Sequence, residues 1–251
     1  MVNGKQRIGS DLLGPVKGQA EACVWLVTAL ALTLVYLGFG QADFLASKVL
    51  PALGVDALGD LQEWWAVLAQ FTCAFVLFFL LPLGAIKLFS QASLGELGLG
   101  LGDKRFGFGF VLPLGVLFLA IPSGLSTWGM ESFQAEYPLA KLAVESPGRF
   151  VLYQLAYGLL YYVAYEAFFR GFLQLGLARK LGHFPALLIQ TSVTTLFHLG
   201  KPLPELWSAL FAGLFFGLLV IRTRSIWPLV LVHWALGVVT DLVAAYGTGL
   251  I

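Results

Sequence analysis

The sequence predicts an all-α protein, a polytopic bundle of about seven transmembrane helices. Of its 251 residues, 59% are hydrophobic and only 12% are charged, and the mean hydropathy is +0.84. A soluble domain carries about 25% charged residues, so this chain lacks the charges that a water-exposed surface needs. Its apolar runs are long and continuous, which is untypical of the alternating strands of a membrane β-barrel. With a net charge of +1, it also offers no phosphate-binding surface for nucleic acid.

Seven apolar segments approach the length of about 20 residues that a membrane-spanning helix needs. They cover residues 22–39, 64–86, 107–129, 151–178, 184–200, 205–221 and 226–247. The first follows a basic segment like that of a signal peptide, but its apolar run is too long and lacks a convincing cleavage site, so we interpret it as a retained span. The chain then divides into a cytoplasmic N-terminal segment (1–21), N-terminal transmembrane helices and loops (22–149), and a helical core (150–247).

The orientation of the spans follows from the distribution of lysine and arginine, which favour cytoplasmic loops. One set of predicted loops holds ten of these residues and the opposite set holds four, while Arg170 lies within a span. The first set consists of Lys5, Arg7, Lys17, Lys87, Lys104, Arg105, Arg179, Lys180, Arg222 and Arg224, and the second of Lys48, Lys141, Arg149 and Lys201. We therefore expect a cytoplasmic amino terminus and an external carboxyl terminus.

Few ionisable residues lie inside the predicted spans, and each costs at least ~2.5–3.5 kcal/mol there. Glu166 and Arg170 are four residues apart, so they share a helix face in the favourable order, acid before base. A structural ion pair explains how the two charges are tolerated. It does not explain why they are present, so we favour a functional role.

Histidine occurs three times, and two of the three, His198 and His233, fall within predicted spans. Each could be a core histidine bonded to a neighbour or a catalytic group. His233, Gly237 and Asp241 are spaced to lie along one helix face. Gly237 either leaves room there for water or a substrate backbone, or provides a close helix contact.

A carboxylate and two imidazoles on three helices are suited to the activation of water. Glu166 can take a proton from water if burial adjusts its basicity, one histidine can orient the water or protonate a leaving amine, and the other can stabilise an oxyanion. The same trio, His198, His233 and Glu166, is also a possible zinc set, although the helical His-Glu-x-x-His spacing is absent. We expect no cofactor, and zinc remains open.

The segment Tyr165-Glu166-Ala167-Phe168-Phe169-Arg170-Gly171 resembles the first motif of the CPBP family. This family contains the type II CAAX prenyl proteases and the bacteriocin-processing Abi proteins. Its pattern is Glu-Glu-x-x-x-Arg, followed in order by Phe-x-x-x-His and His-x-x-x-Asn. Thr194–His198 and His233–Gly237 occupy the second and third motifs, so the resemblance covers about residues 150–245, the predicted catalytic core.

Three positions depart from the family's pattern. Tyr165 stands where the family has its first Glu, which with the second-motif His is taken to activate water. Thr194 replaces the Phe of the second motif, and Gly237 replaces the Asn that is taken to contact the oxyanion. If the chain is active, Glu166 must supply the base, and Asp241, one turn beyond Gly237, is the candidate to replace the lost polar group.

The resemblance implies an intramembrane glutamic-type endopeptidase, with Glu166, Arg170, His198 and His233 as catalytic residues and Tyr165, Thr194, Gly237 and Asp241 in support. Its partners would be membrane lipid and a protein or peptide substrate with a membrane-embedded or lipidated tail. Its expected location is the bacterial inner (plasma) membrane.

Two other classes of function remain open at this point. One is a catalytically inactive membrane scaffold or chaperone, which the changes at Tyr165 and Gly237 favour. The other is a carrier with a proton relay, for which the sequence shows no inverted repeat.

The depth of the site is a difficulty for the catalytic hypothesis. His198 lies about 21 Å into its predicted span and His233 about 10 Å into its own, at 1.5 Å per residue. Since both spans start from the cytoplasmic side, parallel helices would hold the two histidines apart.

Overall fold

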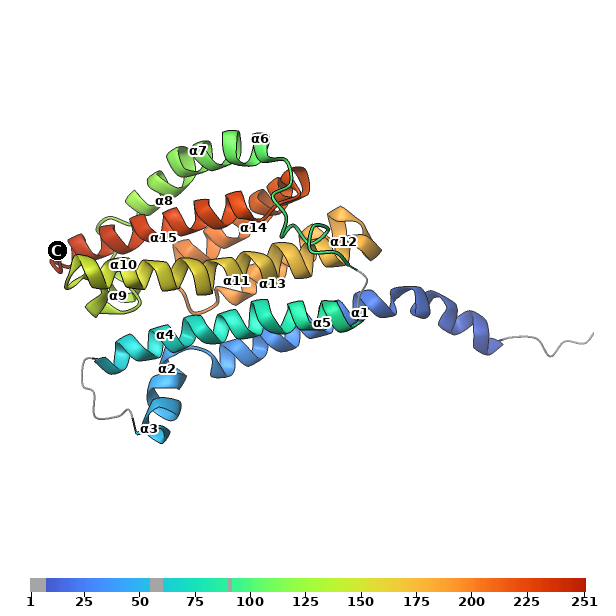
Figure 1. Cartoon of the computed structure of the whole chain (residues 1–251), viewed down its shortest axis with the longest axis horizontal. Coiled ribbons are helices and arrows are strands. Elements are labelled where there is room, and N and C mark those ends of the chain that lie inside the picture. The colour runs from blue at the N-terminus through green and yellow to red at the C-terminus, as the bar shows by residue number, and fades with distance from the viewer. Residues whose placement is uncertain (1–7, 55–60, 90–91) are drawn as a thin grey trace, which may run out of the picture.

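The structure of the chain, a computed structural model, describes residues 8–54, 61–89 and 92–251. Helices joined by turns make up this part of the chain and no strand occurs in it, which confirms the all-α fold class. Lys5 and Arg7, used above for the orientation, lie outside the described residues. Figure 1 shows most helices running along the long axis of the molecule, with the carboxyl terminus at one end.

The amino-terminal part forms two long helices and a short irregular one between them. α1 (Ile8–Phe39) is followed by α2 (Ala42–Phe44), η1 (Leu45–Val49) and α3 (Leu50–Ala52). α4 (Leu61–Phe75), η3 (Val76–Leu80) and α5 (Leu81–Phe89) then form one continuous helix. This helix and α1 lie along the same side of the bundle (Figure 1).

The next part supplies an outer helix and the loop that closes one end of the bundle. α6 (Lys104–Phe106), η4 (Gly107–Val111), α7 (Leu112–Gly115), η5 (Val116–Ala120) and α8 (Ile121–Leu125) are continuous. α9 (Glu131–Glu136) and η6 (Lys141–Val144) follow in the loop. The outer helix contacts α15 (Trp227–Gly247), and Gly115 and Gly124 permit this because an added Cβ would collide with Val232 and Val239. Such small residues bring membrane helices close together.

A central helix of five segments carries the first motif. It consists of α10 (Pro147–Ala156), η7 (Tyr157–Tyr162), α11 (Val163–Glu166), η8 (Ala167–Leu175) and α12 (Gly176–Leu181). Ser146 caps its start by accepting a hydrogen bond from the Arg149 backbone N–H. Gly182, with φ of +83°, ends it. Its η segments are π-helical, a wide turn that is frequent at functional sites.

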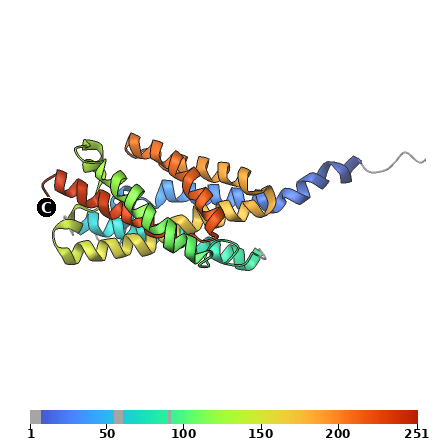
Figure 2. The same ribbon diagram turned by 90° about the horizontal axis from the view of Figure 1, so that it is seen from above.

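The last three helices carry the other two motifs. α13 (His183–Phe197) and α14 (Leu203–Thr223) form a hairpin, and α15 returns along the central helix (Figures 1 and 2). The predicted span 184–200 is too long, because the helix ends at Phe197 and the chain turns at Gly200, whose φ is +93°. His198 therefore lies just past the carboxyl end of α13.

Five of the seven predicted spans are confirmed as helices long and apolar enough to cross a membrane, among the residues described. They are Ala20–Phe39, Leu61–Leu88, Lys104–Leu125, Leu203–Thr223 and Trp227–Gly247. The remaining two predicted spans, 151–178 and 184–200, lie on the central helix and on α13. The first is helical throughout and the second as far as Phe197. Neither is among those five, so the total of seven stays a prediction.

Aromatic side chains fill the interior between the predicted N-terminal part and the predicted core. Tyr153, Tyr157, Tyr161 and Tyr165 recur every four residues, and each ring contacts the next along the central helix. Phe71 on α4 stacks on Tyr157 at 4.5 Å between ring centroids. Because lipid tails are as apolar as these side chains, close packing rather than loss of water stabilises such contacts in a membrane.

Candidate active site

Glu166 and His233 form a buried pair that joins the first and third motifs. Oε1 of Glu166 lies 2.7 Å from Nδ1 of His233, and the carboxylate is fully buried. A carboxylate accepts hydrogen bonds, so Nδ1 of His233 carries the hydrogen and Nε2 of the neutral ring is an acceptor. The side chain of His233 is partly exposed and lines a cavity.

Arg170 holds the other oxygen of the same carboxylate. Its Nε lies 3.3 Å from Oε2 of Glu166, and the guanidinium is almost completely buried. The guanidinium also lies over the rings of Tyr165 and Phe216, 5.3 and 5.7 Å from their centroids. The expected ion pair of the first motif is therefore present in the structure. A buried carboxylate needs a counter-charge, and Arg170 supplies one to Glu166.

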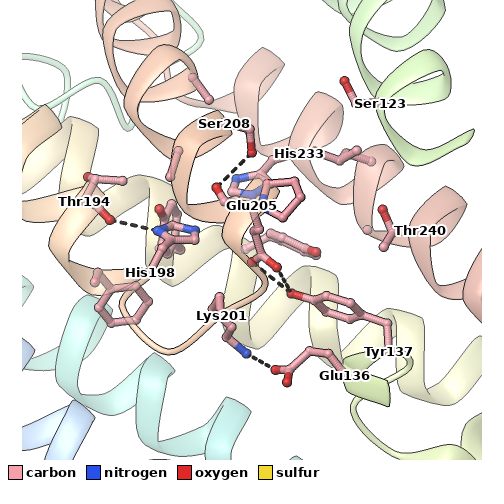
Figure 3. A pocket seen from close by; sticks show the side chains of 18 of the residues that line it. Ser123, Glu136, Tyr137, Thr194, His198, Lys201, Glu205, Ser208, His233 and Thr240 are labelled. Atoms are coloured by element: carbon pink, nitrogen blue, oxygen red, sulfur yellow. Dashed lines mark hydrogen bonds and ion pairs between the residues drawn. The ribbon is translucent and has the colours of Figure 1, made fainter. Parts of the chain in front are cut away.

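His198 reaches the same cavity from the turn after α13. Its Nδ1 lies 2.8 Å from the backbone carbonyl oxygen of Thr194, which only accepts hydrogen bonds, so Nε2 of neutral His198 is also an acceptor. The hydroxyl of Thr194 in turn accepts a hydrogen bond from Nε2 of Gln190. Figure 3 shows the rings of His198 and His233 among the side chains that line the cavity.

The expected separation of the two histidines in depth is wrong. Both rings contact Tyr165 edge to face, with centroid distances of 6.2 Å for His198 and 5.2 Å for His233. Figure 1 shows that the turn between α12 and α13 extends beyond the start of α15. Counting residues from a common starting level therefore placed His198 too far along its helix.

Gly237 does not leave the open space that one sequence interpretation gave it. A Cβ at position 237 would overlap the hydroxyl of Tyr162. The phenol of Tyr162 thus occupies the place beside α15 where a longer side chain of the third motif would begin. Its ring lies 4.8 Å from that of His233, and both residues line the cavity.

Asp241 lies apart from these groups. Its carboxyl is fully buried, and Oδ2 accepts a hydrogen bond of 2.7 Å from Nε2 of Gln154. Oε1 of Gln154 accepts a weaker one of 3.3 Å from the indole N–H of Trp234. Neither Asp241 nor Gln154 is part of the cavity wall, whereas the neighbouring Thr240 is.

The cavity has a volume of about 790 Å³ and a largely aromatic wall with a charged rim. Glu166 itself lies behind His233 and does not line it. The rim consists of residues that the sequence did not single out as functional: Asp43, Glu136, Tyr137, Lys201 and Glu205. Lys201 pairs with Glu136, and the Tyr137 hydroxyl lies 2.9 Å from both carboxylate oxygens of Glu205 (Figure 3).

Two features of the sequence, not used above, relate to the wall of this cavity. Tyr157, Tyr161 and Tyr165, which are spaced four apart, line it from the central helix together with Tyr162. The polar segment 131–149 supplies part of the rim, at Glu136 and Tyr137.

The residues that the structure describes do not form a good metal-binding site around the two histidines. No group of three or more His, Cys, Asp or Glu side chains there has a metal-binding arrangement. Glu166 contacts His233 at Nδ1 and so occupies the position of an outer partner rather than of a third ligand.

Residues 147–239 match the family model described as type II CAAX prenyl endopeptidase Rce1-like. This segment holds all three motifs, and the match confirms the resemblance to the CPBP/CAAX protease family. No curated protein and no solved structure matches the chain.

Proposed function

We propose that this relative of the type II CAAX prenyl endopeptidases is an active intramembrane endopeptidase that hydrolyses a peptide bond with an activated water. The observation that carries the proposal is the buried Glu166–His233 pair, with His198 on the wall of the same cavity. Two imidazoles that border the same cavity are suited to holding and deprotonating a water molecule there.

His233 is the proposed general base and Glu166 its positioning residue. The carboxylate fixes the ring with Nδ1–H toward itself and stabilises the imidazolium that forms when Nε2 takes a proton. This assignment differs from the sequence expectation, in which Glu166 takes the proton itself. We prefer it because Glu166 is fully buried behind His233, while the imidazole borders the cavity.

His198 is proposed to orient the attacking water. The carbonyl of Thr194 fixes its ring, so Nε2 can accept the hydrogen of the water that is not transferred. Tyr165 separates and supports the two imidazoles through its edge-to-face contacts. A tyrosine at this position therefore has a part in an active site that lacks the family's first Glu.

Tyr162 is proposed to donate a hydrogen bond to the oxyanion. Its neutral phenol is a hydrogen-bond donor and lies where Gly237 lacks the side chain of the third motif. Donors of this kind stabilise the charge that develops on the carbonyl oxygen in the transition state. In this proposal the hydroxyl of Tyr162 takes over the role that the family assigns to the Asn at position 237.

The reaction consumes one water and needs no further reactant. Water forms a bond to the carbonyl carbon while its proton passes to Nε2 of His233, and the oxyanion accepts a hydrogen bond from Tyr162. The C–N bond then breaks, and His233 returns the proton to the leaving amine.

A zinc ion is the alternative means of activating water. His198 and His233 could each offer Nε2 to it, but a third protein ligand is not in place among the residues described. Retained cleavage in the presence of a strong chelator supports activation by the two histidines, and its loss supports a metal.

Cleavage can be tested without knowing the substrate. We would replace the gene in its own host with His198→Gln, His233→Gln or His183→Gln and compare the terminal peptides of membrane proteins by mass spectrometry. His183, exposed at the start of α13 and outside the cavity, is the matched control. We expect some terminal peptides to be present both in the wild-type strain and in the His183→Gln strain. The same peptides should be absent from the His198→Gln and His233→Gln strains.

The competing hypothesis is a scaffold without activity, which the departures at Tyr165 and Gly237 motivate. It predicts the same terminal peptides in all four strains, with any growth phenotype preserved in His233→Gln. That result, with equal protein levels, would overturn the proposal.

A further inference from the structure

The cavity lies toward one end of the molecule. Its wall includes residues from the turn after α8, from α9 and from the turn between α13 and α14. Gln41 and Asp43 come from the same end of the bundle. The loops at the opposite end, residues 92–103 and 224–226, contribute no residue to the wall. Figure 1 places α9 near the carboxyl terminus and α12 near the opposite end.

Charged groups show that this end meets water. Glu136 and Lys201 are paired on the rim, with side-chain exposures of 31% and 28%. Asp43 and Glu205 also border the cavity. Ionised side chains in a membrane protein either pair in the interior or reach an aqueous space, because hydrocarbon disfavours them strongly. We take the rim as the aqueous entrance to the histidines.

Basic residues lie mainly at the opposite end. Among the described residues in loops and at helix ends there, seven are basic: Lys87, Lys104, Arg105, Arg179, Lys180, Arg222 and Arg224. The end with the cavity has four: Lys48, Lys141, Arg149 and Lys201. The excess of lysine and arginine marks the cytoplasmic side.

One wall of the cavity also borders the region expected to face lipid. Leu119 and Ser123 on the outer helix and Phe211 and Phe215 on α14 all line it. Phe211 and Phe215 are 67% and 50% exposed. The outer helix packs on α15, whereas α14 packs on α13 and the central helix. An apolar segment can therefore approach the histidines sideways between η5–α8 and α14.

We infer that the site opens to the extracytoplasmic face and to the lipid beside it, and that its substrate is a membrane-embedded protein segment cut near its extracytoplasmic end. The cutting rests on the proposed function. The direction of opening does not, because it follows from the charges and the cavity alone. A water-filled entrance on that face supplies the reaction, while the lateral side admits the apolar segment.

Cysteine labelling tests the direction of opening. In a Cys23→Ala, Cys73→Ala background, we would introduce Ser126→Cys or Ser208→Cys in the cavity, Ile251→Cys beside it, and Leu94→Cys at the opposite end. Cells are first stripped of any layer outside the membrane that holds the protein, while that membrane is left intact. They are then treated with a membrane-impermeant maleimide before and after this membrane is permeabilised. We expect positions 126, 208 and 251 to react in intact cells, and position 94 only after permeabilisation.

Every other pattern overturns the inference. Labelling of position 94 alone in intact cells reverses the orientation and would suit a tail on the cytoplasmic face. Labelling of position 251 without 126 and 208 means that the entrance is closed. The same labelling can be carried out with the His233→Gln variant, which the proposed mechanism makes inactive. A failure of the inference about the direction of opening is therefore distinguishable from a failure of the proposed proteolysis.

Discussion

Nδ1 of His233 lies 2.7 Å from Oε1 of Glu166, although 67 residues separate the two in sequence. The contact brings the first and third motifs together. Glu166 itself does not line the cavity, because it lies behind His233. The pair resembles the acid–imidazole pairs of serine hydrolases, in which the acid fixes the ring and does not itself take the proton.

Glu166→Gln is expected to lower kcat by about a thousandfold to ten-thousandfold, since the amide can hold the ring in the wrong tautomer. The measurement is the rate of cleavage of a peptide found by the terminal-peptide comparison, over a range of pH. The pH profile should change shape, because the proposed base loses its counter-ion. A uniform loss at every pH would instead indicate a structural role only.

Tyr162→Phe is expected to lower kcat by about a hundredfold to a thousandfold with KM little changed, as removal of one oxyanion donor does. The same peptide assay measures both constants. The change removes only the hydroxyl that approaches Gly237, so folding should be preserved. Unchanged kcat would remove Tyr162 from the mechanism.

A double variant sharpens this assignment. Gly237→Asn alone should be inactive, because its Cβ collides with Tyr162. Combining it with Tyr162→Leu frees that space and places an amide donor there, so part of the activity should return. If the single and double variants are equally inactive, the proposal that Tyr162 takes the role of the third-motif Asn is contradicted.

Arg170→Met is expected to lower the free energy of unfolding by about 3–5 kcal/mol, because it leaves the buried Glu166 without its counter-charge. The measurement is denaturant unfolding in detergent micelles. Arg222→Met is the matched control, since Arg222 pairs with Asp103 at the surface with 58% of its side chain exposed. Such an exposed pair contributes little to stability, because water and salt screen it. Equal losses in the two variants would contradict the importance of burial.

The fold class and the motif residues were predictable because each rests on local sequence. Long apolar runs predict helices in a membrane, and five of them are confirmed by length and composition. Glu166 and Arg170 share a helix face by their spacing alone, and the structure shows the ion pair. The cost of charge in hydrocarbon also made His198 and His233 candidates before any contact was known.

Contacts between helices were not predictable in the same way. Whether Glu166 or His233 borders the cavity depends on the rotation of two helices about their axes, which no local pattern fixes. The contact of Tyr162 with Gly237 joins residues 75 positions apart, and a glycine in the sequence does not reveal what fills its space. The rim depends on how loop 126–146 folds against the turn after α13.

Asp241→Asn separates two views of the third motif. The sequence made Asp241 the candidate to replace the missing polar group at position 237, whereas in the structure its carboxyl bonds Gln154 outside the cavity wall. The variant keeps the shape and can keep that bond. We expect kcat/KM to change by less than about tenfold, or ~1.4 kcal/mol, in the peptide assay in which Glu166→Gln loses most of its activity. A loss as large as that of Tyr162→Phe would show that Asp241 reaches the reacting groups, and the oxyanion role of Tyr162 would then need to be reassigned.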